Sequence, residues 1–441
     1  MARPTYKHRL QSATTNSPQG TGVPSLDRQG HSADNAGVPS IPTIRWSRLM
    51  EGRHRWLVLG AWLLAGLVIV QSLPVLRAAM RQNDFSHYYA AGRLAWEGHN
   101  PYRTGLAPMC ERLGLVYDPQ IPVATNPPPL VWLTALLAMW PLRVAFGLWL
   151  GVQLAGLAVI LWLTRRLLGD RLPPLGGHWL AVAAIVSGPV QWNLAYSQVQ
   201  LPLAALVLAA FDWRRRGRER TACAAVTVAC LLKLYPVVLL PWFVWRGRGG
   251  WRGMVERAAV CGAVALAGWC VTGPGWWRDF FAVSTVVIRQ WMIMDPTVFS
   301  VPSLVAKYGS DTAAQLAGLG LIIGGYAWCA WGHGADEEEF ALLTVVMLLA
   351  GWVTWAHYLV FLIFPFTLLV IWVARAPTAG RLAWTACLWV LLNDQEQGLE
   401  RVVELCGRWQ WAMMALPVAG VAGVGAFFAR RIGERTGRSP R

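Results

Sequence analysis

Apolar stretches long enough to cross a membrane recur along this chain from residue 56 to residue 429. A helix needs about 20 apolar residues to span the hydrocarbon core of a bilayer, and a backbone in lipid must satisfy its own hydrogen bonds. With 55% hydrophobic and 14% charged residues, the 441-residue chain is more apolar than one soluble core requires. The pattern predicts an all-α polytopic membrane protein.

Arginine clusters between these stretches predict the topology. They occupy residues 45–55, 165–171, 213–220, 245–257, 375–381 and 430–441. Short loops rich in arginine stay in the cytoplasm. Every arginine cluster lies on the cytoplasmic side if residues 77–143 form a long first outer loop, whose helices lie along the membrane face. This arrangement gives about twelve spans with cytoplasmic termini. HGADEEE (333–339) is then the one acidic inner loop, and acidic residues hardly influence orientation.

Composition divides the chain into three parts. Residues 1–44 are rich in serine, glycine, proline and asparagine, which predicts a disordered cytoplasmic tail. Residues 45–430 form the membrane domain, and residues 431–441 form a basic cytoplasmic tail. The formal charge of +16 could suggest a nucleic-acid partner, but only three lysines are present and the arginines follow the topology pattern. We therefore expect a multi-pass protein of the inner cell membrane and no nucleic-acid partner.

Asp84 follows the first apolar stretch closely, within QNDFSHYYAAGRLAWEGHNPY (82–102). A partly desolvated carboxylate there could act as a general base. It could equally cap the helix that the following residues predict, and the spacing leaves both interpretations open. His87 is one helical turn away and could share the same face. A metal site at this pair is disfavoured, because the spacing places no third ligand.

Lys233 lies where two short apolar half-spans, 221–233 and 235–246, meet at a proline turn. An ionisable side chain at membrane depth is costly unless function or pairing retains it, so contact with a phosphate or sugar is favoured over a structural pair. His357 stands between a tryptophan and a tyrosine at a span boundary. Composition alone favours an interfacial aromatic belt for it.

Three further polar side chains have open interpretations. Gln198 and Gln200 are one residue apart, so only one can readily face a given site. Binding of sugar hydroxyl groups and hydrogen bonding between helices explain them equally well. Arg289 lies in the predicted outer loop 289–304 with Asp295, where both could be solvated or paired.

Several motifs for soluble phosphorylated donors and metals are missing. The sequence has no DxD, no GxxxxGK[ST], no GxGxxG after a strand and no HExxH. A transferase facing away from the cytoplasm needs a group already activated on a lipid, such as a polyprenyl-phosphate sugar. Its phosphate is a good leaving group, so the reaction requires one carboxylate base rather than the acid and base pair of a hydrolase. We expect no metal and no cofactor.

The order of these motifs resembles glycosyltransferase family 87, whose polytopic GT-C enzymes include polyprenyl-phosphate-mannose-dependent alpha-mannosyltransferases of bacterial envelopes. The resemblance runs from about residue 56 to 373 and rests on DFSHYYAAGRLAWEGHNPY, NPPPLVWLTALLAMWPLRVAFGLW, YSQVQLPLAALVLAA, ACLLKLYPVVLLPWFVW and WAHYLVFLIFPF. It implies a GT-C-like fold and an acceptor-activating aspartate, a role that maps onto Asp84. It also implies that Lys233 and His357 hold the lipid phosphate.

Two departures from the family pattern leave the donor sugar open. Ser197-Gln198-Val199-Gln200 stands where the family commonly has Gly-Gln followed by Asn. VFSVPSL (298–304) stands where Asn and Gln often precede Ser-Leu. Both positions are where the resemblance would place sugar or acceptor recognition.

We therefore expect an integral membrane glycosyltransferase that moves a hexose, mannose by analogy, from a polyprenyl-phosphate donor to an envelope lipid or glycan acceptor on the extracytoplasmic side. The reaction would be inverting and metal-independent. Around the base Asp84, the predicted substrate-binding residues are His87, Tyr88, Arg93, Tyr102, Gln198, Gln200, Lys233, Arg289 and His357. The alternative is a multi-span transporter or flippase of a lipid-linked or small polar substrate. It would show an internal repeat, and none is convincing.

Overall fold

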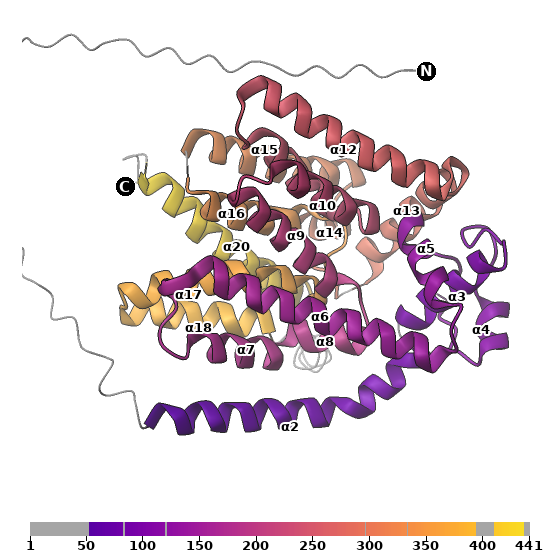
Figure 1. Ribbon diagram of the computed structural model, residues 1–441, viewed down its shortest axis with the longest axis horizontal. Helices are drawn as coiled ribbons and strands as arrows, with labels where there is room; N and C mark the ends of the chain where they lie inside the picture. Colours follow the sequence, from indigo (N-terminus) through magenta and orange to yellow (C-terminus); the bar gives the residue numbers. More distant parts are fainter. Residues whose placement is uncertain are drawn as a thin grey trace, which may run out of the picture. The chain divides into compact units, whose positions relative to one another are not determined.

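Helices make up all the regular structure that the computed structural model describes (Figure 1). The described residues are 53–82, 84–119, 121–295, 297–332, 334–393 and 410–435. Six helical segments among them are long and apolar enough to cross a membrane: Trp56–Trp96, Leu142–Arg171, Gly250–Thr272, Asp311–Gly332, Ala356–Arg375 and Ala415–Glu434. The all-α membrane class is confirmed, whereas about twelve spans and a GT-C-like fold stay predictions. The predicted tail 1–44 and residues 436–441 of the basic tail lie outside the described residues.

The α-helices, with three short 3₁₀ helices labelled η, follow in chain order. They are α2 (Arg53–Gln82), α3 (Asp84–Trp96), α4 (Ala107–Leu113), α5 (Pro128–Leu137), α6 (Leu142–Leu168), η1 (Gly169–Arg171), α7 (Gly176–Val186), α8 (Gly188–Tyr196), α9 (Gln200–Arg215), α10 (Glu219–Leu232), η2 (Tyr235–Leu239), α11 (Leu240–Trp245), α12 (Gly250–Thr272), α13 (Pro274–Met294), α14 (Val301–Tyr308), α15 (Asp311–Gly332), α16 (Asp336–Ala350), η3 (Ala356–Leu362), α17 (Ile363–Arg375), α18 (Ala379–Asn393) and α20 (Gln410–Arg435).

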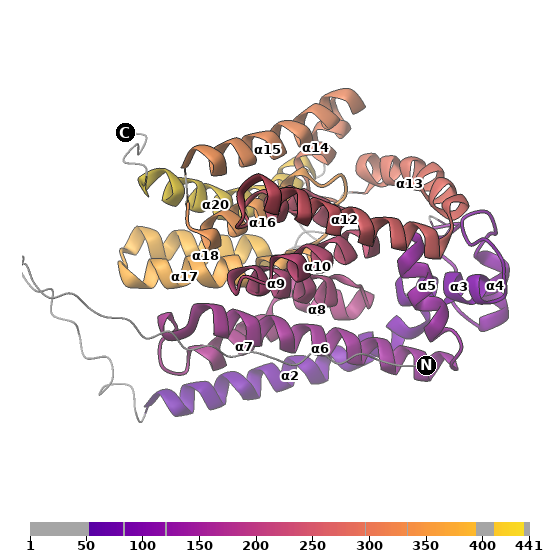
Figure 2. The same ribbon diagram turned by 45° about the horizontal axis from the view of Figure 1, so that its top comes forward.

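The buried core lies around α9, α10 and α16. Every residue of α16 from Glu338 to Ala350 is buried, and the ring of Phe340 stacks on that of Phe211 in α9 with centroids 4.3 Å apart. Gly156 lets α6 approach α9, because a Cβ there would lie 2.8 Å from the backbone nitrogen of Pro202. By contrast, α2 exposes many large apolar side chains, as a lipid-facing helix would. It lies beside α7 (Figure 2), where the rings of Trp62 and His178 meet with centroids 6.4 Å apart. Ser72 Oγ in α2 also donates to Gln191 Oε1 in α8 over 2.8 Å.

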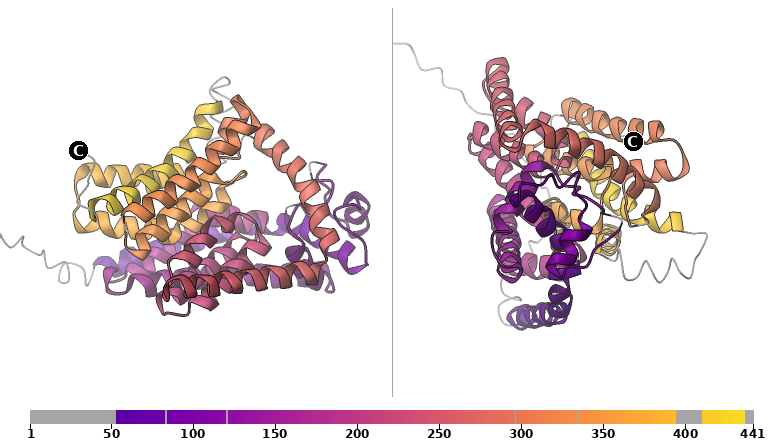
Figure 3. Two further views of the ribbon diagram at one scale, coloured as in Figure 1. Left: turned by 90° about the horizontal axis from the view of Figure 1, so that it is seen from above. Right: turned by 90° about the vertical axis from the view of Figure 1, so that its right-hand side faces the viewer.

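The first long loop contains helices α3, α4 and α5, which pack together and meet α13 (Figure 3). Gly92 lets α3 and α5 touch at the backbone, because a Cβ there would lie 2.5 Å from the carbonyl carbon of Thr134. The turn after α3 docks on α13, where Asn100 Nδ2 and Arg103 Nε both donate to Asp279 Oδ2, over 2.8 and 2.7 Å. The loop is therefore a folded unit that can hold the start of α3 in place.

Two polar regions lie at opposite ends of α9, α10 and α16. The chain breaks after α10 at Lys233, as the sequence predicted, and Lys233 has extended backbone angles (φ −150°, ψ 134°). Gln200 begins α9 at this end, and α16 ends a few residues before His357. The opposite ends carry Arg214, Glu219 and Asp336. At 1.5 Å per residue, these helices separate the two regions by about 20 Å.

Candidate active site

A cavity of about 210 Å³ lies at the Lys233 end of these helices. Its walls come from the start of α3, the loop before α5, the end of α8, the α13–α14 connection and the start of η3. The lining residues are Gln82, Asp84, His87, Asp118, Ile121, Tyr196, Gln198, Trp291, Asp295, Thr297, Trp355 and His357. Four of the predicted site residues, Asp84, His87, Gln198 and His357, therefore meet in one place.

The Asp84 carboxylate is oriented by a chain of hydrogen bonds. Gln198 Nε2 donates to Asp84 Oδ2, and the Tyr88 hydroxyl group donates to Gln198 Oε1 over 2.6 Å. Gln198 and Tyr88 are both buried, whereas Asp84 is half-buried and faces the cavity. Because both atoms of the amide are used, Gln198 holds one oxygen of Asp84 in a fixed direction. Asp84 begins α3, but its described contact is with a residue of another element.

Gln198 owes its position to an unusual backbone turn. Ser197, which ends α8, has a left-handed conformation with φ 54° and ψ 43°, which is uncommon for a residue other than glycine. Trp149 Nε1 in α6 donates to the Ser197 carbonyl over 2.7 Å and holds this turn. The family commonly has glycine at this position, and the positive φ supplies the physical reason. Strain of this kind clusters at functional sites.

Lys233 is not among the residues that line the cavity. It lies near enough to Asp84 and His357 for its charge to act on both side chains. The carboxylate and the ammonium group therefore share one polar region, on the same side of the core. A negatively charged ligand group in this polar region, near His357, would be attracted by the ammonium group of Lys233.

His87 and His357 are buried without satisfied ring nitrogens. Their side chains are 7% and 4% exposed, and neither ring nitrogen of either residue has a hydrogen-bond partner within the part of the chain described. The ring of His357 stacks on Trp355 with centroids 5.7 Å apart and meets Tyr358 edge-on at 4.9 Å. Buried polar atoms are normally paired, so these imidazoles are suited to bind a substrate.

Three other predicted residues are engaged away from the cavity. Arg93 pairs with Glu97 over 2.8 Å, the favourable contact of residues one helical turn apart. The Tyr102 hydroxyl group donates to the Asn126 carbonyl over 2.5 Å and supports the loop. Arg289 pairs with Asp311 over 2.7 Å. None of the three is among the residues that line this cavity, and their substrate contacts stay predictions. Gln200 is buried and also does not line it, and its Oε1 faces Asn193 Nδ2 at 3.5 Å.

Sequence reasoning missed several residues that line the cavity. Asp118 was not singled out, although a lone aspartate in the same outer loop as Asp84 was a usable signal. Trp291 and Thr297 come from a segment whose approach to α3 depends on tertiary contacts. Asp295, left open above, is structural at both carboxylate oxygens: Thr297 Oγ1 donates to Oδ1 over 2.7 Å and Trp355 Nε1 donates to Oδ2 over 3.0 Å.

Comparisons with known proteins identify the family of the chain. The sequence model of glycosyltransferase family 87 matches residues 124–354, which is just over half of the 441 residues. This range includes Gln198 and Lys233 and ends before His357.

Similarity to individual proteins is more limited. A polyprenol-phosphate-mannose-dependent alpha-(1-2)-phosphatidylinositol mannoside mannosyltransferase of Mycobacterium tuberculosis is 31% identical over 123 residues, which cover 27% of this chain and only 28% of that relative. The crystal structure of ArnT from Cupriavidus metallidurans, bound to undecaprenyl phosphate, matches 86% of this chain and 78% of that chain with 15% identity and a TM-score of 0.39. A TM-score this low does not establish a shared fold.

Proposed function

Because the chain belongs to glycosyltransferase family 87, we propose that it transfers a hexose, namely mannose, from a polyprenyl-phosphate-linked donor to an envelope lipid or glycan acceptor. The family makes the protein a glycosyltransferase rather than a transporter, and the six apolar helices found in the described part of the chain make it a membrane protein. The donor is proposed by analogy with the mycobacterial relative. The observation that carries the mechanism is the Asp84 carboxylate, held by Gln198 at a cavity with two histidines that have no hydrogen-bond partner among the described residues.

Asp84 acts in this mechanism as the general base. The acceptor hydroxyl group loses its proton to the carboxylate while its oxygen attacks the anomeric carbon of the donor. The bond between that carbon and the phosphate oxygen breaks, and the new glycosidic bond forms on the opposite face of the ring. One displacement of this kind inverts the anomeric configuration, and it needs no second carboxylate. The absence of a metal from the reaction stays a prediction.

The leaving group explains the basic residues near the cavity. A polyprenyl-phosphate sugar is a phosphodiester with one negative charge, and the released polyprenyl phosphate carries a second. Charge that develops during the reaction is best stabilised by groups already held in place. We assign this role to Lys233 and to the buried His357, whose ring nitrogens can reach a ligand in the cavity.

The proposed side of the membrane is the extracytoplasmic one. Arg214 and Arg215 end α9 at the side of the core opposite the cavity, and Arg165 and Arg166 lie in the last turn of α6. The positive-inside rule favours the cytoplasm for such arginine-rich ends. This supports a cavity that opens away from the cytoplasm, where a lipid-linked donor is required.

A transfer assay with two donors tests the proposal. Membranes containing the protein are incubated with radiolabelled polyprenyl-phosphate mannose or with radiolabelled GDP-mannose, and label in the glycolipid and glycan fractions is counted. We expect transfer from the lipid-linked donor alone, loss of transfer in Asp84→Asn, and wild-type transfer in the exposed control Asp170→Asn. Transfer from GDP-mannose in the absence of lipid carrier would overturn the donor assignment.

A further inference from the structure

Acidic side chains gather in the lining of the cavity. Three of its lining residues are aspartates, Asp84, Asp118 and Asp295, and no lysine or arginine is among the described residues that line it. Asp295 is occupied by Thr297 and Trp355. The charge of Asp118 acts on both Asp84 and His87, which places the three side chains close to one another. The wall formed by α3 and the first loop is therefore acidic.

His87 gives this wall a second feature, independent of its charge. The imidazole is 7% exposed, lines the cavity and has no hydrogen-bond partner for either nitrogen among the residues with a described position. A neutral imidazole offers one donor and one acceptor, and a carboxylate offers acceptors only. A ligand with several hydroxyl groups satisfies both, because each hydroxyl group can donate and accept.

Aromatic side chains form another part of the lining. Trp291 and Trp355 meet at a ring-centroid distance of 5.3 Å and an angle of 67°, and the indole nitrogen of Trp355 is fixed by Asp295 over 3.0 Å. The negative face of an indole ring attracts the C–H groups of a saturated sugar ring. The cavity volume of about 210 Å³ is below the roughly 300 Å³ at which pockets for drug-sized ligands begin. A cavity of this size suits sugar rings rather than a whole lipid-linked substrate.

We infer that His87 and Asp118 form a subsite for one uncharged, polyhydroxylated ring, a monosaccharide or cyclitol, and that this ring carries the hydroxyl group of the acceptor. We place the donor phosphate beside His357, as proposed above, and the acceptor ring beside His87 and Asp118. The role of this ring as the acceptor rests on the proposed function, whereas the binding of a neutral ring at this site does not. A ring bearing a carboxylate or phosphate is repelled by the aspartates.

A binding measurement tests the subsite without donor or turnover. The purified protein in lipid nanodiscs is titrated at pH 7 with methyl α-D-mannopyranoside and with methyl α-D-mannopyranosiduronic acid, which differ by a carboxylate, and binding is followed by saturation-transfer NMR. We expect at least tenfold tighter binding of the neutral glycoside. Asp118→Asn should reduce this preference to less than threefold, and the exposed loop variant Glu111→Gln should leave it unchanged. Equal binding of the two probes to the wild type would overturn the inference.

A kinetic measurement separates a subsite from a merely structural role. In the transfer assay, Asp118→Asn and His87→Phe should raise the KM for a methyl mannoside acceptor about tenfold with the donor KM unchanged. Equal rises in both KM values, or no rise in either variant, would contradict the assignment. If the neutral glycoside binds through Asp118 but no donor supports transfer, the proposed function fails and the neutral-ring site stands. If transfer occurs but Asp118→Asn binds both probes like the wild type, only the subsite fails.

Discussion

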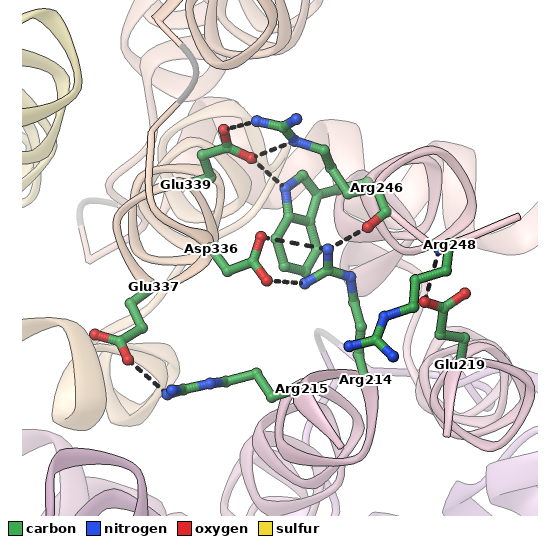
Figure 4. Close-up of polar contacts among 9 residues, drawn as sticks. Arg214, Arg215, Glu219, Arg246, Arg248, Asp336, Glu337 and Glu339 are labelled. Carbon is green, nitrogen blue, oxygen red and sulfur yellow. Dashed lines mark hydrogen bonds and ion pairs between the residues drawn. The ribbon is translucent and has the colours of Figure 1, made fainter. Parts of the chain in front are cut away.

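The two polar regions at the ends of α9, α10 and α16 differ in how their charges are satisfied. At the arginine-rich end, Asp336, Glu337 and Glu339 in the first turn of α16 each bond to at least one arginine (Figure 4). Arg214 contacts Asp336 over 2.8 Å, and Arg215 contacts Glu337 over 2.5 Å. At the cavity end, the ring nitrogens of His87 and His357 have no hydrogen-bond partner among the residues that the structure describes. Paired charges hold helices together, and unpaired buried groups are those that a substrate can use.

The network at the arginine-rich end also revises the sequence analysis. The acidic stretch 333–339 was considered only for its weak influence on orientation. From Asp336 onward it is the first turn of α16, where carboxylates favour the positive end of the helix dipole. Arginines that the sequence explains as a topology signal also bind these carboxylates. Both explanations can hold, because orientation and packing act on the same side chains.

The comparison predicts the largest loss of stability at Glu339. Its carboxylate is fully buried and accepts hydrogen bonds from Arg246 and from Trp242 Nε1, the latter over 2.9 Å. Glu339→Gln leaves the half-buried guanidinium group of Arg246 without its charged partner, which costs about 3 kcal/mol. We expect a clear fall in the thermal midpoint of the detergent-solubilised protein, with the kcat of the folded fraction retained. The exposed pair partner Glu256 provides the control, and Glu256→Gln should leave the midpoint unchanged.

At the cavity end, Lys233 should show the opposite result. Lys233→Gln removes the ammonium group that stabilises the departing phosphate, and loss of one preorganised group of this kind lowers kcat by about 100-fold. The thermal midpoint of unfolding should stay unchanged, because Lys233→Gln also removes the cost of keeping a charged group away from water. The fall in kcat and the unchanged thermal midpoint are checked by measuring steady-state transfer and thermal unfolding on the same preparation. A large fall in the midpoint with normal kcat would make Lys233 a structural residue.

Gln198 sharpens the comparison with a smaller effect. Gln198→Ala breaks the chain from Tyr88 to Asp84 and leaves the base free to turn, so we expect kcat to fall about tenfold, equivalent to about 1.4 kcal/mol. Tyr88→Phe should have a weaker effect in the same direction, because the Gln198 bond to Asp84 remains. Transfer rates at saturating donor and acceptor measure both. A stronger effect for Tyr88→Phe than for Gln198→Ala would contradict the orienting role.

The smallest expected effect concerns the loop that holds α3. The pKa of Asp279 lies below its usual value, mainly because Arg103 donates a hydrogen bond to the carboxylate. A carboxyl group with a lowered folded-state pKa contributes stability above its unfolded pKa of about 3.9, and this contribution is lost as the pH falls through the folded value. Thermal midpoints measured from pH 7 to pH 3 should therefore show a slightly steeper acid loss for the wild type than for Asp279→Asn. If the thermal midpoints of the two proteins fell in parallel with pH, the lowered pKa of Asp279 would not contribute to stability.

Sequence reasoning recovered the membrane class, and the site residues stay predictions. Asp84 was singled out as an ionisable group beside a long apolar stretch, with a helix cap as an equal alternative, and His357 was singled out only through the family resemblance. The partners of Arg93 and Arg289, which are Glu97 and Asp311, could not be predicted, because they depend on local helix geometry and on the approach of α15. Asp118 and Trp291 could not be assigned to the same cavity, because only the folding of the first loop against α13 brings them together. The backbone conformation of Ser197 was not predicted either. Glycine is the residue that usually signals a positive φ, and this position has serine instead.

The central claim is that the Asp84 carboxylate removes the proton in the chemical step. The most direct test is a single-turnover measurement with excess protein in nanodiscs, polyprenyl-phosphate mannose and a saturating neutral acceptor. General-base catalysis contributes about 10²–10⁴-fold, so Asp84→Asn should slow this single turnover at least 100-fold while it binds the donor as tightly as the wild type. A single-turnover rate within threefold of the wild type, at equal donor binding, would contradict the account.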